Sequence, residues 1–314
     1  MEVIIMKKSI LYIIFALVLV MLSGCEKEIK FKGEETESKA VMNSKALEGE
    51  GPIKVRMSYS RFFLSQEPLQ YINDATVKLW SNGLLCGNGS SIGDGWYEID
   101  YIPQCNDSLY MEAVTTKGEK LSAKTYVPKK VELSDIKLDE KIDEFSSGYY
   151  KEYEFILRFN LHDVAKENNY YQISLIMDRE DETGESLGEN VVWFKCDDPF
   201  ITESNGNVFS SSDELTLLRF SDEAIDGKNY QVKLTGEFNL DASVYQYNQK
   251  YLLYVQVESL SKEEYLYKKT REQSYDNENN PFAEPVMIYS NVENGIGIFS
   301  ASTIDRFLVK VFKD

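Results

Sequence analysis

Much of the chain alternates between hydrophobic and polar residues with a period of two, which is typical of β-strands with one buried face. In the first part of the sequence this alternation predicts short strands at 53–59, 75–80, 96–99, 109–114 and 121–127. Turn sequences such as Ser81-Asn82-Gly83 and Gly93-Asp94-Gly95 separate them. Strands at this spacing predict an antiparallel β-sandwich.

The pattern is interrupted at Val127-Pro128-Lys129-Lys130, where a proline ends a strand and two charged residues follow. We place a domain boundary here, between a sandwich over 39–130 and a larger β-rich domain over 131–314. The second domain has predicted strands at 153–159, 170–177, 191–195, 214–220, 230–234 and 251–259. One stretch, 261–273, is helical in pattern, because Ser261 and Glu264 form a capping box ahead of it. The prediction is a mainly β protein with one C-terminal helix.

The N-terminus carries a different hydrophobic pattern. Lys7 and Lys8 precede an unbroken apolar run at 10–22. As a helix this run would span about 20 Å, which is short of the roughly 30 Å hydrocarbon core, so it predicts a signal peptide rather than a permanent span. Leu22-Ser23-Gly24-Cys25 resembles the bacterial lipobox. We therefore predict that residues 1–24 are removed and that Cys25 is the lipidated residue.

The residues that follow the anchor indicate where the protein is presented. Residues 25–38 are charged and poor in core formers, so they predict a flexible tether. Glu26 and Glu28 resemble an acidic surface-export signal. The expected location is the outer membrane, lipid-anchored and facing the cell exterior.

The net charge narrows the classes of partner. The full chain carries −18, and loss of the signal with Lys7, Lys8 and Glu2 leaves −19. Nucleic acid is excluded as a partner, because neutralising phosphates requires clustered lysine and arginine. Twenty-one tyrosines and sixteen phenylalanines favour sheet packing, with a sugar- or peptide-binding surface as the alternative.

Few residues suggest a catalytic or metal-binding role. His162 is the sole histidine, and we place it in a loop between two strands. No G-x-S-x-G occurs, and the acidic stretch 178–185 lacks EF-hand spacing. The sequence therefore predicts no catalytic residue, no metal site, no cofactor and no enzyme activity.

The cysteines beyond the anchor leave two options open. Cys86 and Cys105 flank the predicted hairpin at Asp94, and in an exported chain they could form a disulfide. Ideal pairing about Asp94 leaves Cys105 about three residues out of register, so a bulge would be needed. The other option is three free thiols, with Cys196 unpaired in either case.

Two resemblances to known families extend these inferences. The first is carried by Ala75-x-Val77-x-Leu79, Gly95-x-Tyr97 and Leu109-x-Met111-x-Ala113. This pattern resembles carboxypeptidase-regulatory and transthyretin-like modules, which are immunoglobulin-like sandwiches that act as spacers or docking units. The resemblance implies such a fold for 39–130.

The second resemblance lies near the C-terminus. Asn280-Pro281-Phe282-Ala283-Glu284-Pro285 leads to Ser290-Asn291-Val292-Glu293-Asn294-Gly295-Ile296-Gly297-Ile298-Phe299. This resembles the closing signature, N-P-F-x-E-P then S-N-I-x-G-G-x-G-I-F, of the Bacteroidetes-type outer-membrane lipoproteins named domain of unknown function 4249. Here Asn294 replaces the first glycine of the pair. Further matches are Asn73-Asp74-Ala75-Thr76-Val77, Glu167-Asn168-Asn169-Tyr170-Tyr171, Phe220-Ser221-Asp222, Asp226-Gly227-Lys228 and Tyr265-Leu266-Tyr267.

The second resemblance implies a surface lipoprotein encoded beside a TonB-dependent receptor. We expect a noncatalytic accessory that captures a ligand (a glycan, a peptide or a small nutrient) or caps the receptor. The alternatives are a surface hydrolase and an adhesin or structural surface protein. The signature residues are either a fold-defining crossover or part of a binding site.

Overall fold

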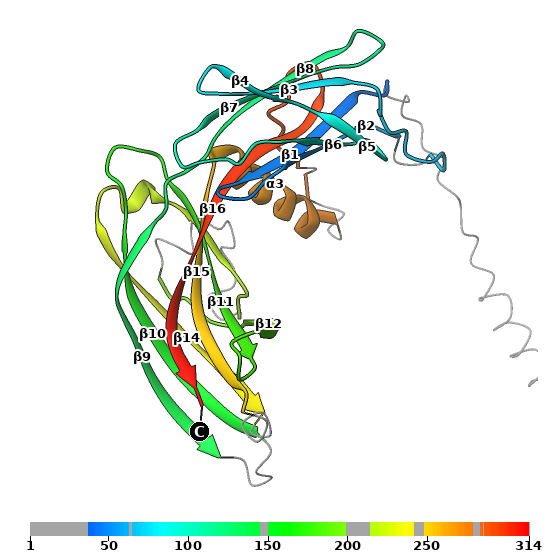
Figure 1. The fold of residues 1–314 in the computed structure, drawn as a ribbon. Coiled ribbons are helices and arrows are strands. Elements are labelled where there is room, and N and C mark those ends of the chain that lie inside the picture. The colour runs from blue at the N-terminus through cyan, green and yellow to red at the C-terminus, as the bar shows by residue number, and fades with distance from the viewer. Residues whose placement is uncertain are drawn as a thin grey trace, which may run out of the picture. The chain divides into compact units, whose positions relative to one another are not determined.

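The structure is a computed structural model that describes residues 37–62, 65–144, 150–198, 214–241, 248–278, 283–284 and 286–313. The predicted signal at 1–24, Cys25, and the signature residues Asn280, Pro281, Phe282 and Pro285 lie outside these residues. The described chain is mainly β, as predicted (Figure 1).

The predicted N-terminal sandwich consists of two packed sheets (Figure 1). One layer has the order β1-β2-β6-β5, with strands at Ala40–Leu47, Ile53–Tyr59, Trp96–Ile99 and Ser90–Gly93. The other has the order β4-β3-β7-β8, with strands at Leu84–Asn88, Thr76–Ser81, Ser108–Val114 and Lys120–Tyr126. Alternate side chains such as Val55, Leu79 and Met111 are fully buried and form one hydrophobic core between the layers. This arrangement is compatible with an immunoglobulin-like sandwich.

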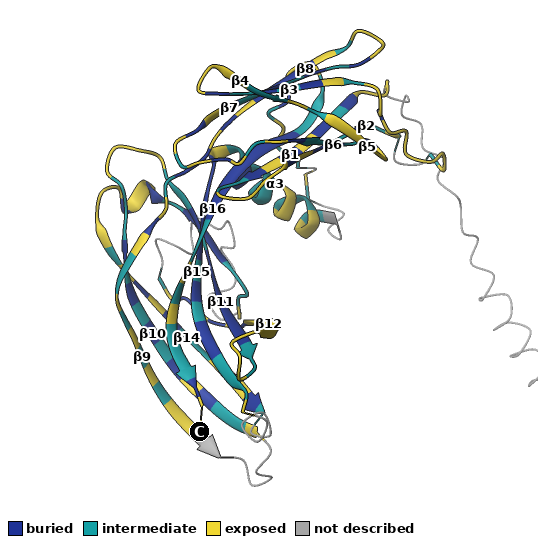
Figure 2. Ribbon diagram, viewed as in Figure 1, coloured by how far each residue is buried: buried dark blue, intermediate teal, exposed yellow. Residues whose placement is uncertain are grey.

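The remaining strands enclose a second core. A sheet of order β14-β10-β9 is formed by Asn229–Asp241, Tyr150–His162 and Glu132–Glu144. It packs against β12, β11, β15, β16 and β13, which are Ser186–Val192, Tyr170–Glu180, Lys250–Leu260, Ile296–Phe312 and Leu218–Ser221. Phe159, Leu175 and Val255 lie at the centre of this core with no exposed surface. Figure 2 shows that buried residues recur along the strands of both sandwiches.

One strand belongs to both sandwiches. The first part of β16 runs parallel to β1, with Val41 paired to Ile296, and the second part runs antiparallel to β15. Within the described residues, a single nine-stranded sheet therefore extends from the first core into the second. Most of the first core comes from residues before 130, but Phe299 and Ala301 of β16 also belong to it.

A single α-helix, α3 at Lys262–Glu278, occurs among the described residues. It begins where the capping box predicts, because the Glu264 backbone N–H donates to Ser261 Oγ at 3.2 Å. It ends five residues beyond the predicted helix. The helix lies against β16 and β15 (Figure 1). No helix among the described residues has the length and apolar character that crossing a membrane requires.

Candidate functional site

A pocket of about 350 Å³ opens where three distant segments of the chain meet. Tyr126, Pro128 and Lys129 come from the end of β8, and residues 167–170 come from the β10–β11 connection. Residues 260–263 contribute the end of β15 and the first turn of α3. This volume lies within the range of small-ligand sites, about 300–1,000 Å³.

Two tyrosines give the pocket aromatic surface. Tyr126 is 43% exposed, and its hydroxyl donates to Asn106 Oδ1 at 2.7 Å. Tyr170 stacks on Tyr265 of α3 with ring centroids 4.6 Å apart. Burial raises the pKa of both Tyr126 and Tyr170, so both hydroxyls stay protonated at neutral pH. Rings held in this way can pack against a ligand without losing much side-chain freedom.

The charged groups of the pocket are balanced. Lys129 and Glu167 form an ion pair at 2.6 Å, and the Thr125 hydroxyl donates to Glu263 at 3.0 Å. Lys262 supplies a second positive charge. The lining thus carries two positive and two negative groups, unlike the acidic protein as a whole.

The β10–β11 connection is held in place by three aspartates beside the pocket. Asp222 accepts the Asn169 backbone N–H at 2.9 Å, and Asp226 accepts the Lys166 backbone N–H at 2.8 Å. Asp163 accepts the Tyr171 hydroxyl at 2.6 Å. Burial raises the pKa of Asp222, a shift that the negative charges of Asp163 and Asp226 reinforce.

The same three aspartates could in principle bind a cation. One carboxylate oxygen from each lies within 4.8 Å of the others. Each aspartate, however, already accepts a backbone N–H, since Asp163 also receives that of Gly227 at 2.7 Å. The cluster therefore works as a cross-link between the β10–β11 connection and the short 3-10 helix η1, Asp222–Ala224.

Local sequence explains this cross-link. Gly227 has a φ of +67°, and a Cβ there would lie 2.7 Å from the Ala165 Cβ, so only glycine fits without displacement. The motif residues Asn169, Tyr171, Asp222 and Asp226, quoted above without a role, converge here. The sequence analysis did not foresee this convergence, and Asp222 and Asp226, shortly before Gly227, were the available signal.

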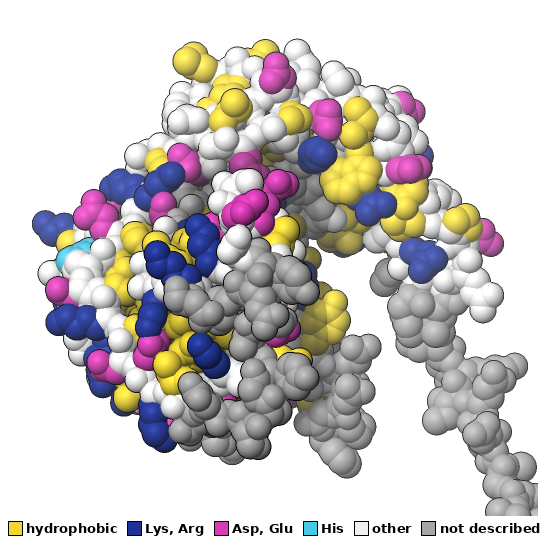
Figure 3. Space-filling view, turned by 60° about the horizontal axis from the view of Figure 1, so that its bottom comes forward, with side chains coloured by type: hydrophobic (Ala, Val, Ile, Leu, Met, Phe, Trp, Pro, Cys, Tyr) yellow, Lys and Arg dark blue, Asp and Glu magenta, His cyan; other side chains and the backbone are white. Residues whose placement is uncertain are grey.

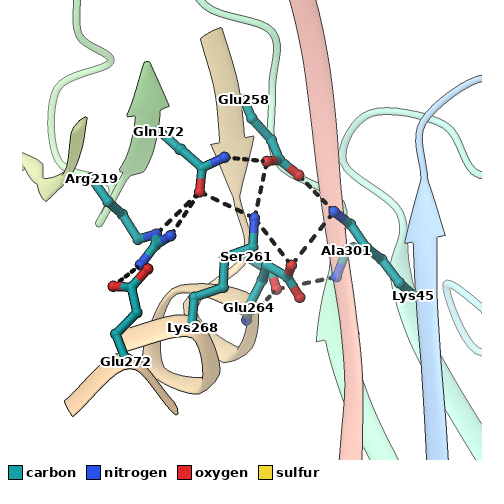
Figure 4. Close-up of polar contacts among 9 residues, drawn as sticks. All are labelled: Lys45, Gln172, Arg219, Glu258, Ser261, Glu264, Lys268, Glu272 and Ala301. Carbon is teal, nitrogen blue, oxygen red and sulfur yellow. Dashed lines mark hydrogen bonds and ion pairs between the residues drawn. The ribbon is translucent and has the colours of Figure 1, made fainter. Parts of the chain in front are cut away.

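A second polar network holds α3 on the sheet (Figure 4). Glu258 of β15 accepts from Lys45 of β1 at 2.6 Å and from Lys268 of α3 at 3.0 Å. Glu264 lies 3.5 Å from Lys45 and 3.3 Å from Lys268. Burial alone would raise the pKa of Glu258, but the charges of Lys268 and Lys45 outweigh it and lower the pKa to about 2.

The network continues along the helix through Arg219, which is 5% exposed. Its Nη2 donates to Gln172 Oε1 at 2.9 Å, and its Nη1 donates to Glu272 at 2.6 Å. Gln172 in turn donates to Glu258 at 3.1 Å. The chain of contacts fixes α3 relative to β15 and its neighbouring strands (Figure 4), and α3 carries Tyr265.

The C-terminal signature has a structural role in the described residues. Asn291 Nδ2 donates to the Phe299 carbonyl at 2.8 Å, and the Phe299 N–H donates to Asn291 Oδ1 at 2.9 Å. A Cβ at Gly297 would lie 2.2 Å from the Met42 carbonyl oxygen, and one at Gly295 would lie 2.6 Å from the Leu121 Cδ2. Glycine at these two positions lets β16 enter the first sandwich beside β1. Glu284, in contrast, is exposed, and its carbonyl accepts from Asn277 at 3.1 Å.

The two cysteines of the predicted hairpin are free thiols in the structure, so the disulfide option is not realised. The hairpin at Asp94 pairs Ser90–Gly93 with the strand that starts at Trp96, but Cys86 belongs to β4 in the other sheet. No ladder therefore leads from Cys86 to Cys105. Cys196 is also free and is buried.

His162 is placed differently from the prediction. It closes strand β10 rather than lying in a loop. Its Nδ1 and Nε2 each lie 2.7 Å from an oxygen, of Asn229 and Ser134 respectively, on the two flanking strands. The imidazole therefore links three strands.

Comparison with known proteins adds the family. A search of curated proteins finds no match to this chain. The family model described as domain of unknown function (DUF4249) matches residues 26–307, which is most of the chain. The chain therefore belongs to the DUF4249 family.

Proposed function

We propose that this protein is a lipid-anchored, surface-exposed and noncatalytic binding protein that serves a TonB-dependent transporter of the outer membrane. The observation that carries the binding role is the pocket beside the start of α3. Two of its three walls are held by contacts within the protein: the aspartate cross-link holds residues 167–170, and the polar network around Glu258 holds the start of α3. Preorganisation of this kind lowers the entropic cost of binding.

The polar groups of the pocket favour binding over catalysis. Both carboxylates are already engaged, Glu167 by Lys129 and Glu263 by Thr125. A general acid or base must reach the reacting atom with a group tuned for proton transfer, whereas these two carboxylates are committed to neighbours on the protein. These two side chains are arranged to position a ligand.

The anchor and tether support action against a membrane-embedded partner. A flexible tether of the length that the sequence predicts for 25–38 would have a root-mean-square reach of roughly 20 Å. Confinement at this reach raises the effective concentration of a neighbouring receptor towards about millimolar, so a weak contact is enough.

Exposed hydrophobic side chains offer a surface for that contact. Val191 of the edge strand β12 is 46% exposed, and Trp193 just after it is 54% exposed. Figure 3 shows hydrophobic side chains among lysines and arginines on one face of the molecule. An apolar contact suits the predicted mature chain with its net charge of −19, because charge repulsion would oppose docking onto another acidic surface.

Crosslinking in intact cells followed by mass spectrometry tests the transporter role. We expect a TonB-dependent receptor to be enriched over an unrelated lipoprotein control, and a Trp193→Asp variant to reduce this enrichment. Asn190→Ala, a change at an exposed position within β12, should leave it unchanged. Recovery of this protein alone would reject the accessory role and favour an adhesin or structural surface protein.

A further inference from the structure

We infer that the pocket between Tyr126, Asn168 and the start of α3 binds a neutral saccharide. This inference rests on the proposed binding function and names its ligand class. It follows from three properties of the pocket, namely its charge, its aromatic surface and its available hydrogen-bonding groups.

The charge balance argues for a neutral ligand. The lining contains Lys129 and Lys262 against Glu167 and Glu263. Lys129 and Glu167 already neutralise each other at 2.6 Å. An anionic ligand would meet Glu167 and Glu263, and a cationic ligand would meet Lys129 and Lys262, so neither gains a net attraction.

The aromatic surface argues for a ligand with an apolar face. Tyr126 lines the pocket and is 43% exposed as a residue, while its hydroxyl donates to Asn106. The ring of Tyr170 is held by its stack on Tyr265. A sugar ring presents C–H groups on its faces and hydroxyls around its edge, so one face packs on a tyrosine while the hydroxyls reach polar groups.

The pocket provides such polar groups at its rim. Asn168 is exposed and offers both an amide donor and an amide acceptor. The adjacent Asn169 is fixed in place, since its side chain donates to the Val164 carbonyl at 3.0 Å and its backbone to Asp222. The tyrosine ring can contact the apolar face of a neutral sugar, and the neighbouring amides can form hydrogen bonds with its hydroxyls.

Isothermal titration calorimetry of the full lipidated protein tests this inference. The protein is kept in lauryldimethylamine oxide, because a sugar-headed detergent would compete for the pocket. The neutral probes are maltotetraose, cellotetraose, mannotetraose and xylotetraose. Tetragalacturonic acid, tetralysine and the peptide Gly-Ser-Gly-Ser represent anionic, cationic and neutral nonsaccharide ligands.

The variants separate ring stacking from hydrogen bonding. We expect at least one neutral saccharide to bind, and Tyr126→Ala and Asn168→Ala each to weaken it about tenfold. Tyr126→Phe should bind nearly as well as the unmodified protein, because it keeps the ring. Tyr275→Ala, at a 62% exposed tyrosine on α3, and Asn190→Ala are matched controls that should not change binding.

The outcomes distinguish this inference from the proposed function. If none of the four saccharides binds, or if Tyr126→Ala and Asn168→Ala bind them unchanged, the saccharide assignment is wrong. If the peptide or a charged probe binds instead and Tyr126→Ala weakens it, the pocket is a binding site for another class. If a saccharide binds but no receptor is crosslinked in cells, the saccharide assignment is supported and the transporter role is rejected.

Discussion

Replacing Glu258 by glutamine should destabilise the protein strongly at neutral pH. Glu258 is 5% exposed and faces both Lys268, whose side chain is 17% exposed, and Lys45, whose side chain is 39% exposed, so the substitution leaves Glu264 as their remaining carboxylate. Removing one partner of a fully buried ion pair costs about 3–5 kcal/mol, and the partial exposure of Lys45 places this substitution towards the lower end. The pKa gives a second value of similar size. Lowering it from 4.5 to about 2 corresponds to about 3 kcal/mol of stability at neutral pH.

The pH dependence follows from the direction of this shift. The folded state holds the pKa of Glu258 below its unfolded value, so the stabilisation is complete above the unfolded pKa. It is lost as the pH falls from about 4.5 towards about 2. The Glu258→Gln variant lacks this increment at every pH, whereas the unmodified protein loses it on acidification. The difference between their free energies of unfolding should therefore shrink as the pH falls.

Equilibrium urea unfolding at pH 7 and pH 3, followed by tryptophan fluorescence, measures both effects. Glu189→Gln is the matched control. Glu189 pairs with Arg306 at 2.5 Å, but both side chains are exposed, at 38% and 40%, so its loss should cost at most about 1 kcal/mol. The reasoning fails if Glu258→Gln costs no more than Glu189→Gln at pH 7, or if the gap between Glu258→Gln and the unmodified protein is the same at pH 3.

Three further predictions concern the anchor, the signature and the thiols. Cys25→Ala should abolish metabolic labelling with a fatty acid, and persistent labelling would reject the lipobox assignment. Gly297→Ala should lower the free energy of unfolding by at least about 2 kcal/mol, because φ is +125° and the Met42 carbonyl lies 2.2 Å from the new Cβ. Gly93→Ala, with φ +95° and nothing within 4 Å, should cost less in the same urea titration. Cys86 should react with a maleimide in the native protein. Cys196, 4% exposed and with a pKa raised by burial, should react only on unfolding, as mass spectrometry of labelled peptides would show.

Local pattern predicted many of the strands correctly. The alternation at 53–59 became β2 and that at 109–114 became β7, because each strand has one face on a core and one towards solvent. Strand β9, in contrast, was not predicted. Its apolar residues Leu133 and Ile136 are three apart in sequence. Both pack on the second core because Asp135 adopts a φ of +51° where the pairing with β10 shifts register. An irregularity of this kind removes the period of two on which the prediction depends.

The candidate pocket could not be predicted from the sequence. Its walls at 126–129, 167–170 and 260–263 are far apart along the chain, and alternation does not say which strand ends meet. The start of α3 was predicted because Ser261 and Glu264 are close neighbours in sequence. The capping box is only half formed, however. The Ser261 N–H donates to the Ala301 carbonyl at 2.8 Å, while the Glu264 side chain turns to the lysines. The local sequence therefore predicted the start of the helix, but long-range contacts with Lys45 and Lys268 determine what the Glu264 side chain binds.

The parallel pairing of β1 with β16 also fixes the order in which the molecule can be completed. Ala46 lies beside Ala301, so the first sandwich lacks the strand that pairs in parallel with β1 until residue 301 has been synthesised, 255 residues after Ala46. Contacts at such sequence separation slow folding, because a very long loop must close before they form. Although most of its residues are encoded first, the first sandwich is therefore completed only when β16 is made, as the second sandwich is. For a chain exported as proposed, this delay keeps the polypeptide free of a complete first core while it is still being translocated.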